Sequence, residues 1–522
     1  RADYQFGDTV GTVGILADYS TMTLDGYRAN SFTERKQFNG KLGFDLNDQL
    51  HVNMVFNQFD MPLARDPLGL TRKQLNADPS QAGNGASTYS VRKTVLQNQL
   101  GSSATYTLDK DRSFTGRAYY GTRDNLQFQV GTPGPNAGGA WTGLNRAYYG
   151  LGLQYNEQAV WSGTPVNWAA GYEFDRSREF RQSGSAALGQ KTKTTRSEDN
   201  QAENSDLFVQ GSALVSDHVS VSTGLRYSTV RFASDDYYPV SATDPNGSGN
   251  VSYQATNPVL GVTWHATDDL NLYANYGKGF ETPTLAEMAY KFDSTNALVG
   301  QFNTALNASS SQHYELGTKW APNPRSRVDF AIYQIDTVDE IVVASSGSGK
   351  TVYKNAPSTT RTGWELSGST QLTPHVSLTA SASMIEAKYA QTYSSNGTTI
   401  TAGSKLPGIP QSSVFSELAW TSEAAGAASR NGLRLGLEMV QAGRLYANDT
   451  NTESADGHTV FNLSASQRWS LGKGALTAYA RVNNVGDERY VGSVIVNQSA
   501  LQFYEPGLPQ NWTLGLSLNL PL

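Results

Sequence analysis

The amino-acid sequence predicts an all-β fold: a transmembrane antiparallel β-barrel of about 22 strands. Three observations support this prediction. Apolar and polar residues alternate over stretches long enough to cross a bilayer, the alternation recurs along the chain, and short polar turns alternate with long loops rich in Gly, Ser, Asn and Thr. The two kinds of connection are typical of barrels with short periplasmic turns and long extracellular loops.

The last eleven residues, 512–522, show the alternation most clearly. The apolar row consists of Trp512, Leu514, Leu516, Leu518, Leu520 and Leu522, and the residues between them are small or polar. A period of two places the apolar row on one face of a strand and the polar row on the other. A tilted strand of this length can cross the hydrocarbon layer, so we expect this stretch to close the barrel.

The composition favours a β-rich protein and excludes several kinds of site. The 522 residues include 50 glycines, 27 tyrosines and 9 tryptophans, and they contain no run of 18 apolar residues that would form a membrane-spanning helix. Without cysteine the chain can have no disulfide, thiolate metal site or cysteine nucleophile. The net charge of −6 is not gathered into basic runs, so we expect no nucleic-acid partner.

Strands of the same kind are expected along the whole chain. After a stub at residues 3–6, they are predicted at 10–20, 37–46, 50–60, 95–108, 113–121, 144–155, 166–175, 207–215, 219–227, 259–264, 270–276, 314–320, 327–336, 364–372, 376–387, 412–420, 433–439, 461–469 and 476–484. A long loop that contains residues 61–71 is expected between the strands 50–60 and 95–108. We count about 20 or 21 full strands and no linker, so residues 1–522 are interpreted as one barrel domain, and a barrel of this size holds a plugged lumen.

Charged residues indicate which row faces the interior. In residues 433–439 the charges lie only between the leucines, and residues 476–483 follow the same rule. A charge that faces lipid at mid-depth costs roughly 2–4 kcal/mol, so the charged row must face a polar interior. The predicted lumen-lining residues are Arg117, Glu173, Arg226, Arg434, Glu438 and Arg481. The alternative is a soluble β-sandwich with one solvated face, but its exposed leucine rows would promote aggregation.

Three stretches carry a resemblance to a known family. Residues 272–288, L-Y-A-N-Y-G-K-G-F-E-T-P-T-L-A-E-M, resemble the mid-barrel strand of TonB-dependent receptors and the acidic Thr-Pro loop that follows it. Residues 484–490 resemble the family's N-x-F-D-x-x-Y segment, with Gly486 in place of the Phe. Residues 511–522 resemble the closing strand, although Leu522 replaces the usual terminal aromatic residue.

The resemblance implies uptake of a scarce nutrient (ferric siderophore, haem, cobalamin or another) with energy from a TonB complex. The family carries an N-terminal plug domain and a TonB box, whereas strand-like alternation begins here within about ten residues of Arg1. We therefore expect both to be absent from this chain, either because the plug lies upstream or because the chain is an open pore. Contact with the TonB complex is expected only through that plug region. The expected partners are outer-membrane lipid and a ferric siderophore or similar chelate, and the protein is expected to be a monomer.

No pattern in the sequence indicates catalysis or a resident cofactor. The six histidines are scattered without the spacing of metal ligands, and we interpret them as turn or rim residues. Ligand contacts are expected from loop aromatic residues that stack on a chelate and from cations that meet its charge. The candidates are Trp141, Tyr237, Tyr238, Phe302, Tyr393, Tyr446, Phe503, Tyr504, Arg65, Arg444 and Lys350. The alternative for each aromatic residue is the interfacial girdle or packing between loops.

Three functions remain open at this point. The first is a TonB-dependent transporter barrel in the bacterial outer membrane that takes up an iron–siderophore complex. The second is a passive porin without a plug. The third is a soluble or surface β-protein that binds glycans, which would remain monomeric in buffer without detergent.

Overall fold

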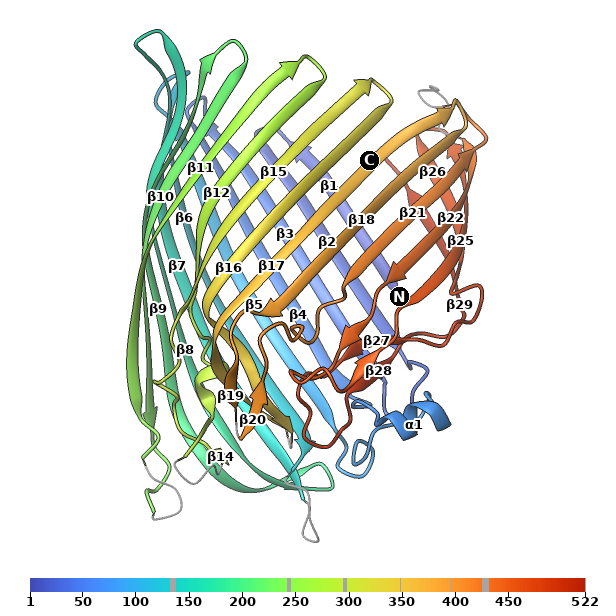
Figure 1. Ribbon diagram of the computed structural model, residues 1–522. Helices are drawn as coiled ribbons and strands as arrows, with labels where there is room; N and C mark the ends of the chain where they lie inside the picture. Colours follow the sequence, from blue (N-terminus) through green and yellow to red (C-terminus); the bar gives the residue numbers. More distant parts are fainter. Residues whose placement is uncertain are drawn as a thin grey trace.

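The chain forms one large antiparallel sheet that curves round on itself as the wall of a barrel (Figure 1). The computed structural model describes residues 1–131, 138–241, 246–293, 298–347, 349–395, 397–424 and 431–521. The sheet has 21 strands. They are β1 (Ala2–Val10), β2 (Val13–Leu24), β3 (Thr33–Asn47), β4 (Leu50–Arg65), β5 (Arg92–Thr107), β6 (Arg112–Val130), β7 (Gly139–Trp161), β8 (Thr164–Ala187), β9 (Gln190–Ser216), β10 (Val219–Asp236), β11 (Gly249–Thr267), β12 (Leu270–Glu281), β15 (Ser309–Asn323), β16 (Ser326–Gly347), β17 (Lys350–Thr373), β18 (Val376–Tyr389), β21 (Ser412–Thr421), β22 (Gly432–Ala442), β25 (His458–Leu471), β26 (Gly474–Asn483) and β29 (Asn511–Asn519).

Each of these strands pairs in antiparallel fashion with the next one in the chain. The number of strands is one below the predicted 22. β1 leads into a two-residue turn, and β29 follows a long loop. Both strands therefore run from the end of the barrel that carries the long loops to the end that carries the short turns. No ladder among the described residues joins these two strands.

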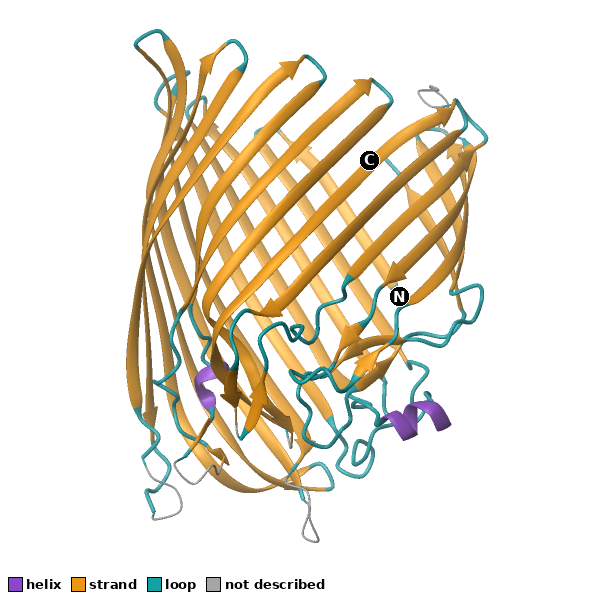
Figure 2. Ribbon diagram, viewed as in Figure 1, coloured by secondary structure: helices purple, strands orange, loops and turns teal. Residues whose placement is uncertain are grey.

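The two ends of the barrel differ in their connections (Figure 2). At one end, which we call the hairpin end, most turns are short, as between β3 and β4 or between β9 and β10. The other end, the loop end, carries the long loops and their small elements. These are α1 (Arg72–Ala77), η1 (Glu287–Ala289), β13 (Lys291–Phe292), β14 (Leu298–Val299), β19 (Tyr393–Ser395), β20 (Thr398–Ile400), β23 (Leu445–Tyr446), β24 (Ser454–Ala455), β27 (Val491–Val494) and β28 (Tyr504–Pro506).

The predicted rows of side chains are present in the wall. Leu514 and Leu516 of β29 are 76% and 77% exposed on the outer surface, where hydrocarbon would cover them. In the ladder between β21 and β22, Leu418 and Leu437 are directly opposite each other, and so are Glu417 and Glu438. The leucines therefore share one face of the sheet and the carboxylates share the other. The prediction of an all-β membrane barrel is confirmed.

No helix in the described parts of the chain has the length and apolar character needed to span a bilayer.

The wall is much taller on one side than on the other. β8 and β9 have 24 and 27 residues, whereas β26 and β29 have only 10 and 9. The sequence predicted shorter strands, 166–175 and 207–215, within the first two. The additional length lies at the loop end, where these strands continue past the others (Figure 1).

Lumen tyrosines lie flat against glycines of the neighbouring strand. Tyr479 of β26 faces Gly515 of β29 in the ladder, and Tyr273 of β12 faces Gly317 of β15. A Cβ atom at either glycine would collide with the tyrosine ring. The missing side chain therefore leaves the space in which the aromatic ring covers the backbone of the wall.

Candidate functional site

Charged side chains on the inner face of the wall neutralise one another at mid-height. Arg117 of β6 and Arg226 of β10 both form ion pairs with Glu173 of β8, and the second pair has an N–O distance of 2.6 Å. Arg226 also contacts Asp206 of β9 at 2.5 Å, and Asp206 is 3% exposed. These four strands are thereby joined by one network of alternating charges.

A second set of ion pairs lies on the shorter side of the wall. Arg434 of β22 contacts Glu417 of β21 at 2.5 Å. Arg481 of β26 donates through Nη2 to Glu438 Oε2 of β22 at 2.6 Å. All six residues predicted to line the lumen are thus engaged in ion pairs with other residues of the wall. Because the positive and negative charges of these pairs cancel, the paired residues present little net charge to a charged ligand.

Positive charge gathers instead at the loop end, around Tyr290. This residue follows η1 directly and is 7% exposed. The guanidinium carbons of Arg181 (β8) and Arg196 (β9) each lie 5.1 Å from the centroid of its ring, and Lys350 Nζ (β17) lies 5.5 Å from it. The Tyr290 hydroxyl accepts a hydrogen bond from Arg181 Nη2 at 2.8 Å.

The two arginines share one buried carboxylate. Glu198 is 3% exposed and lies 2.6 Å from Arg196 Nε and 3.8 Å from Arg181 Nη1. Arg196 also donates through Nη1 to the carbonyl oxygen of Ala289 at 2.7 Å, which ties β9 to the η1 loop. Lys350 has no ion-pair partner among the residues that the structure describes. Three cations therefore surround Tyr290, and Glu198 is the carboxylate that two of them share.

The electrostatics of the cluster are visible in the pKa of Tyr290. Burial alone would raise the pKa of the phenol. The positive charges of Arg181, Arg196 and Lys350 nevertheless bring it below its ordinary value of 10.0. A site that stabilises a phenolate also stabilises other oxygen anions.

A cavity of about 380 Å³ lies beside this cluster, and we call it the Tyr290 cavity. Arg196, Tyr290 and Lys350 line it, together with Tyr238 and Asp236. The Asp236 carboxylate accepts hydrogen bonds from the backbone nitrogens of Tyr238 and Gly247, both at 2.9 Å. The wall on its other side comes from the ends of β6, β7 and β8.

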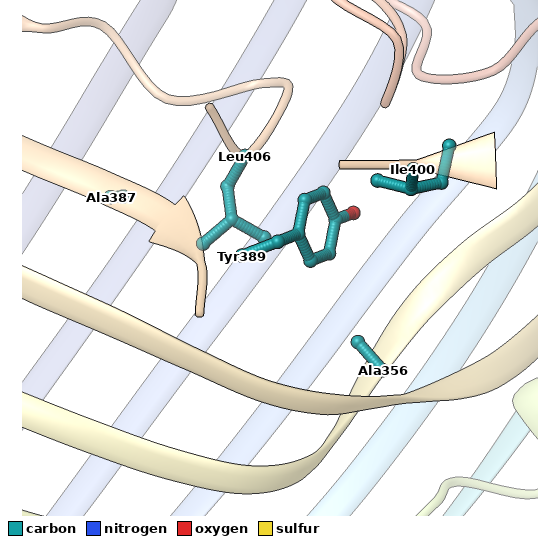
Figure 3. Close-up of a cluster of buried hydrophobic side chains, with 5 residues drawn as sticks. All are labelled: Ala356, Ala387, Tyr389, Ile400 and Leu406. Carbon is teal, nitrogen blue, oxygen red and sulfur yellow. The ribbon is translucent and has the colours of Figure 1, made fainter. Parts of the chain in front are cut away.

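The loops on the shorter side of the wall are tied together around Tyr389. Figure 3 shows its ring between the side chains of Leu406 and Ile400, which come from the loop after β18. The Tyr389 hydroxyl donates to Asp449 Oδ1 at 2.7 Å, and Lys354 Nζ of β17 lies 3.5 Å from Asp449 Oδ2. Loops 390–411 and 443–457 are therefore joined to β17.

Tyr504 ties further loops together. It is fully buried in β28, its hydroxyl accepts from Arg72 Nη2 at 2.7 Å, and it donates to Glu453. The Arg72 guanidinium carbon also lies 4.1 Å from the ring centroid. The backbone of Tyr504 pairs with Leu70 in both directions, at 2.7 and 3.0 Å. Loops 66–91, 443–457 and 484–510 thus meet at one side chain.

The aromatic residues predicted as ligand contacts lie in several places. Trp141 and Tyr238 line the Tyr290 cavity. The Trp141 indole donates to the Lys193 carbonyl oxygen at 3.3 Å and lies under Lys191 Nζ at 4.0 Å. Tyr237 is 61% exposed. The remaining aromatic candidates are engaged with other loop residues: Phe302 in the cluster of Phe232, Met288 and Leu306, Tyr393 under Lys354, Tyr446 in the small hairpin of β23 and β24, and Phe503 beside Tyr504.

The predicted cationic contacts are equally dispersed. Lys350 belongs to the Tyr290 cavity. Arg444 lies 3.6 Å from Asp456, and both side chains are more than half exposed. Arg65 is the last residue of β4, where its backbone nitrogen donates to the Phe32 carbonyl oxygen at 2.7 Å. The structure therefore brings Lys350 together with Trp141 and Tyr238, and it keeps the other two cations apart from them.

Sequence reasoning missed Tyr290, Arg181 and Arg196. No motif connects them, because they belong to three segments that meet only in the folded barrel. One local signal was available elsewhere. The sequence Thr71-Arg72-Lys73-Gln74 is a capping box, and it begins α1 in a stretch that was predicted to be loop.

In the described residues, no three His, Cys, Asp or Glu side chains are grouped so that they could hold a metal ion. His51 contacts Asp45, and His458 stacks on Tyr490 with ring centroids 4.2 Å apart.

Several solved structures share this architecture. The unliganded ferric citrate transporter FecA matches with a TM-score of 0.81 and 16% identity over 99% of this chain and 75% of its own. The ferric yersiniabactin uptake receptor FyuA from Yersinia pestis matches with a TM-score of 0.78 and 15% identity over 98% and 76%. BauA, the ferric preacinetobactin receptor from Acinetobacter baumannii, gives 0.75 and 13% over 99% and 77%. At these identities the likeness concerns the fold.

A family profile adds evidence from the sequence itself. The family described as "TonB dependent receptor-like, beta-barrel" matches residues 2–485. The match covers nearly the whole wall, from β1 to the end of β26. The chain therefore belongs to the TonB-dependent receptor β-barrel family.

Proposed function

We propose that this protein is a bacterial outer-membrane receptor that takes up an iron–siderophore complex with energy from the TonB system. The observation that carries the proposal is the family match over residues 2–485. The structural relatives add support, because the three described above are named as transporters or receptors of ferric citrate, ferric yersiniabactin and ferric preacinetobactin. The long loops then lie outside the cell and the hairpin end faces the periplasm.

The barrel wall has the properties that this role requires. Its outer leucine rows suit lipid, and the charges predicted to line the lumen are paired within the wall, where a plug domain could lie against them. We infer that the TonB complex acts through such a plug and not through the wall, and that the protein works as a monomer. No catalytic step belongs to the proposal.

Deletion of the complete gene in its host tests the proposal. The deletion strain should lose growth under iron limitation with at least one siderophore of a panel, and it should lose uptake of radiolabelled iron from that siderophore. The same loss is expected when TonB is removed. Unchanged growth with every siderophore would contradict uptake of iron–siderophore complexes, and a large, permanently open conductance in planar bilayers would favour a passive pore instead.

A further inference from the structure

The Tyr290 cavity differs from the rest of the interior in its balance of charge. At mid-height the arginines predicted to line the lumen each meet a carboxylate, as Arg226 meets Glu173 and Asp206. Around Tyr290, Arg181 and Arg196 share Glu198, and Lys350 has no carboxylate partner in the described part of the chain. Asp236 also lines the cavity, but its carboxylate accepts two backbone hydrogen bonds, so three cations meet two carboxylates and positive charge is in excess. Positive charge in a confined, partly dry space attracts anions more strongly than the same charge in open water.

Two of the cations have capacity left for a ligand. Arg196 uses Nε for Glu198 and Nη1 for Ala289, and no acceptor for its Nη2 is found among the described residues. Lys350 lines the same cavity, its Nζ lies 5.5 Å from the centroid of the Tyr290 ring, and no hydrogen-bond acceptor for it is found in the described part of the chain. Guanidinium and ammonium groups placed together form charge-assisted hydrogen bonds with oxygen anions.

The fold holds Lys350 in this position. It is the first residue of β17 and follows Gly349, which has a φ of +71° at the tip of the β16–β17 hairpin. A Cβ atom at Gly349 would lie 2.7 Å from Gln129 Oε1 of β6, so this tip leans closely against the opposite side of the cavity. A larger residue at position 349 would push the hairpin, and Lys350 with it, away from Arg196.

We propose that the Tyr290 cavity selects iron(III) chelates that present carboxylate oxygens, with Arg196 and Lys350 as the residues that contact them. This inference rests on the proposed function, and it specifies the chemical class of the ligand. Tyr290 acts as a positioning residue, because its ring and hydroxyl hold Arg181 and Arg196 beside the cavity. A cationic chelate is disfavoured at the same place, since it would meet like charge.

Binding measurements on the full chain in detergent micelles test this selectivity. The probes are ferric citrate, which presents carboxylates, and ferrioxamine B, a cationic trihydroxamate chelate. Ferric citrate should bind more tightly, and added salt should weaken its binding. Lys350→Gln should weaken its binding about tenfold or more, the effect of losing one charge-assisted contact, whereas Lys350→Arg should restore most of the affinity. Lys110→Gln is the matched control, because Lys110 lies at the hairpin end with a side chain that is 88% exposed.

Two further outcomes separate this inference from the proposed function. Iron uptake from ferrioxamine B that equals uptake from ferric citrate, with no effect of Lys350→Gln on either, would overturn the carboxylate selectivity and leave iron uptake standing. Ferric citrate binding that depends on Lys350, without transport of any chelate, would support the anion site and contradict iron uptake. Equal affinity of the wild type and Lys350→Gln for ferric citrate would overturn the inference by itself.

Discussion

The hydroxyl of Tyr389 donates a hydrogen bond to Asp449 Oδ1 at 2.7 Å. Both residues are buried, and they lie 60 positions apart in the chain: Tyr389 ends β18, and Asp449 belongs to the loop 443–457. The second oxygen of the same carboxylate lies 3.5 Å from Lys354 Nζ. One buried carboxylate therefore connects the end of β18, the loop 443–457 and the first turn-proximal residues of β17.

Asp449→Asn should loosen these loops without unfolding the wall. The amide leaves Lys354 without its counter-ion in a mostly buried place, which costs on the order of 3 kcal/mol. Hydrogen exchange of loops 390–411 and 443–457 should accelerate, while exchange in the wall strands should stay unchanged. Asp456→Asn is the control, because Asp456 belongs to the same loop with a side chain that is 84% exposed. Equal exchange in the two variants would contradict this role of Asp449.

Tyr504 should keep its proton to unusually high pH. Burial raises its pKa to about 12, its hydrogen bond to Glu453 adds to the shift, and Arg72 opposes it. The folded pKa exceeds the ordinary value of 10.0, so the protonated Tyr504 contributes to the free energy of unfolding. This contribution is complete below pH 10 and is lost as the pH rises through about 12. The absorbance of the phenolate band is measured against pH for the wild type and for Tyr504→Phe, and the difference between the two curves is the titration of Tyr504. A difference that titrates near pH 10 would contradict the burial of this phenol.

The alternation predicted the strands within the hydrocarbon layer better than their continuation beyond it. β9 was predicted at 207–215 and begins at Gln190. Residues 190–206 are polar in both rows apart from Ala202, because neither face of the strand meets lipid so far toward the loop end. Their extended conformation comes from pairing with β8, which sequence periodicity cannot show.

The candidate site was less predictable than the wall. Lys350 could be suggested as a loop cation, but its neighbours Arg181 and Arg196 lie on strands whose ends the sequence did not reveal. Their distance from Tyr290 depends on the curvature of the whole sheet and on the course of the η1 loop. The alternation could assign Arg481 and Glu438 to the polar row of the wall, but it did not predict that they form an ion pair, and it predicted nothing of the cavity.

A charge on the outer face of β29 should impair folding into lipid. Leu516 is 77% exposed in the leucine row, and Leu516→Arg should destabilise the folded barrel by roughly 2–4 kcal/mol if the side chain lies near the bilayer centre. Ser517→Arg is the matched control, since Ser517 belongs to the opposite row. Both variants should be folded into lipid vesicles and unfolded with denaturant. Equal stability of the two variants would contradict the orientation of the rows.

Gly515 should resist substitution because Tyr479 occupies the space of its missing side chain. In Gly515→Ala the added methyl group forces the Tyr479 ring off the wall, and we expect a loss of about 1 kcal/mol in the free energy of unfolding. Gly116→Ala is the control, because a Cβ atom there meets nothing within 4 Å. The cost at Gly515 should disappear in a Tyr479→Ala background, since the collision is then removed. A cost that persists in that background would show that the backbone of β29, and not the tyrosine ring, requires the glycine.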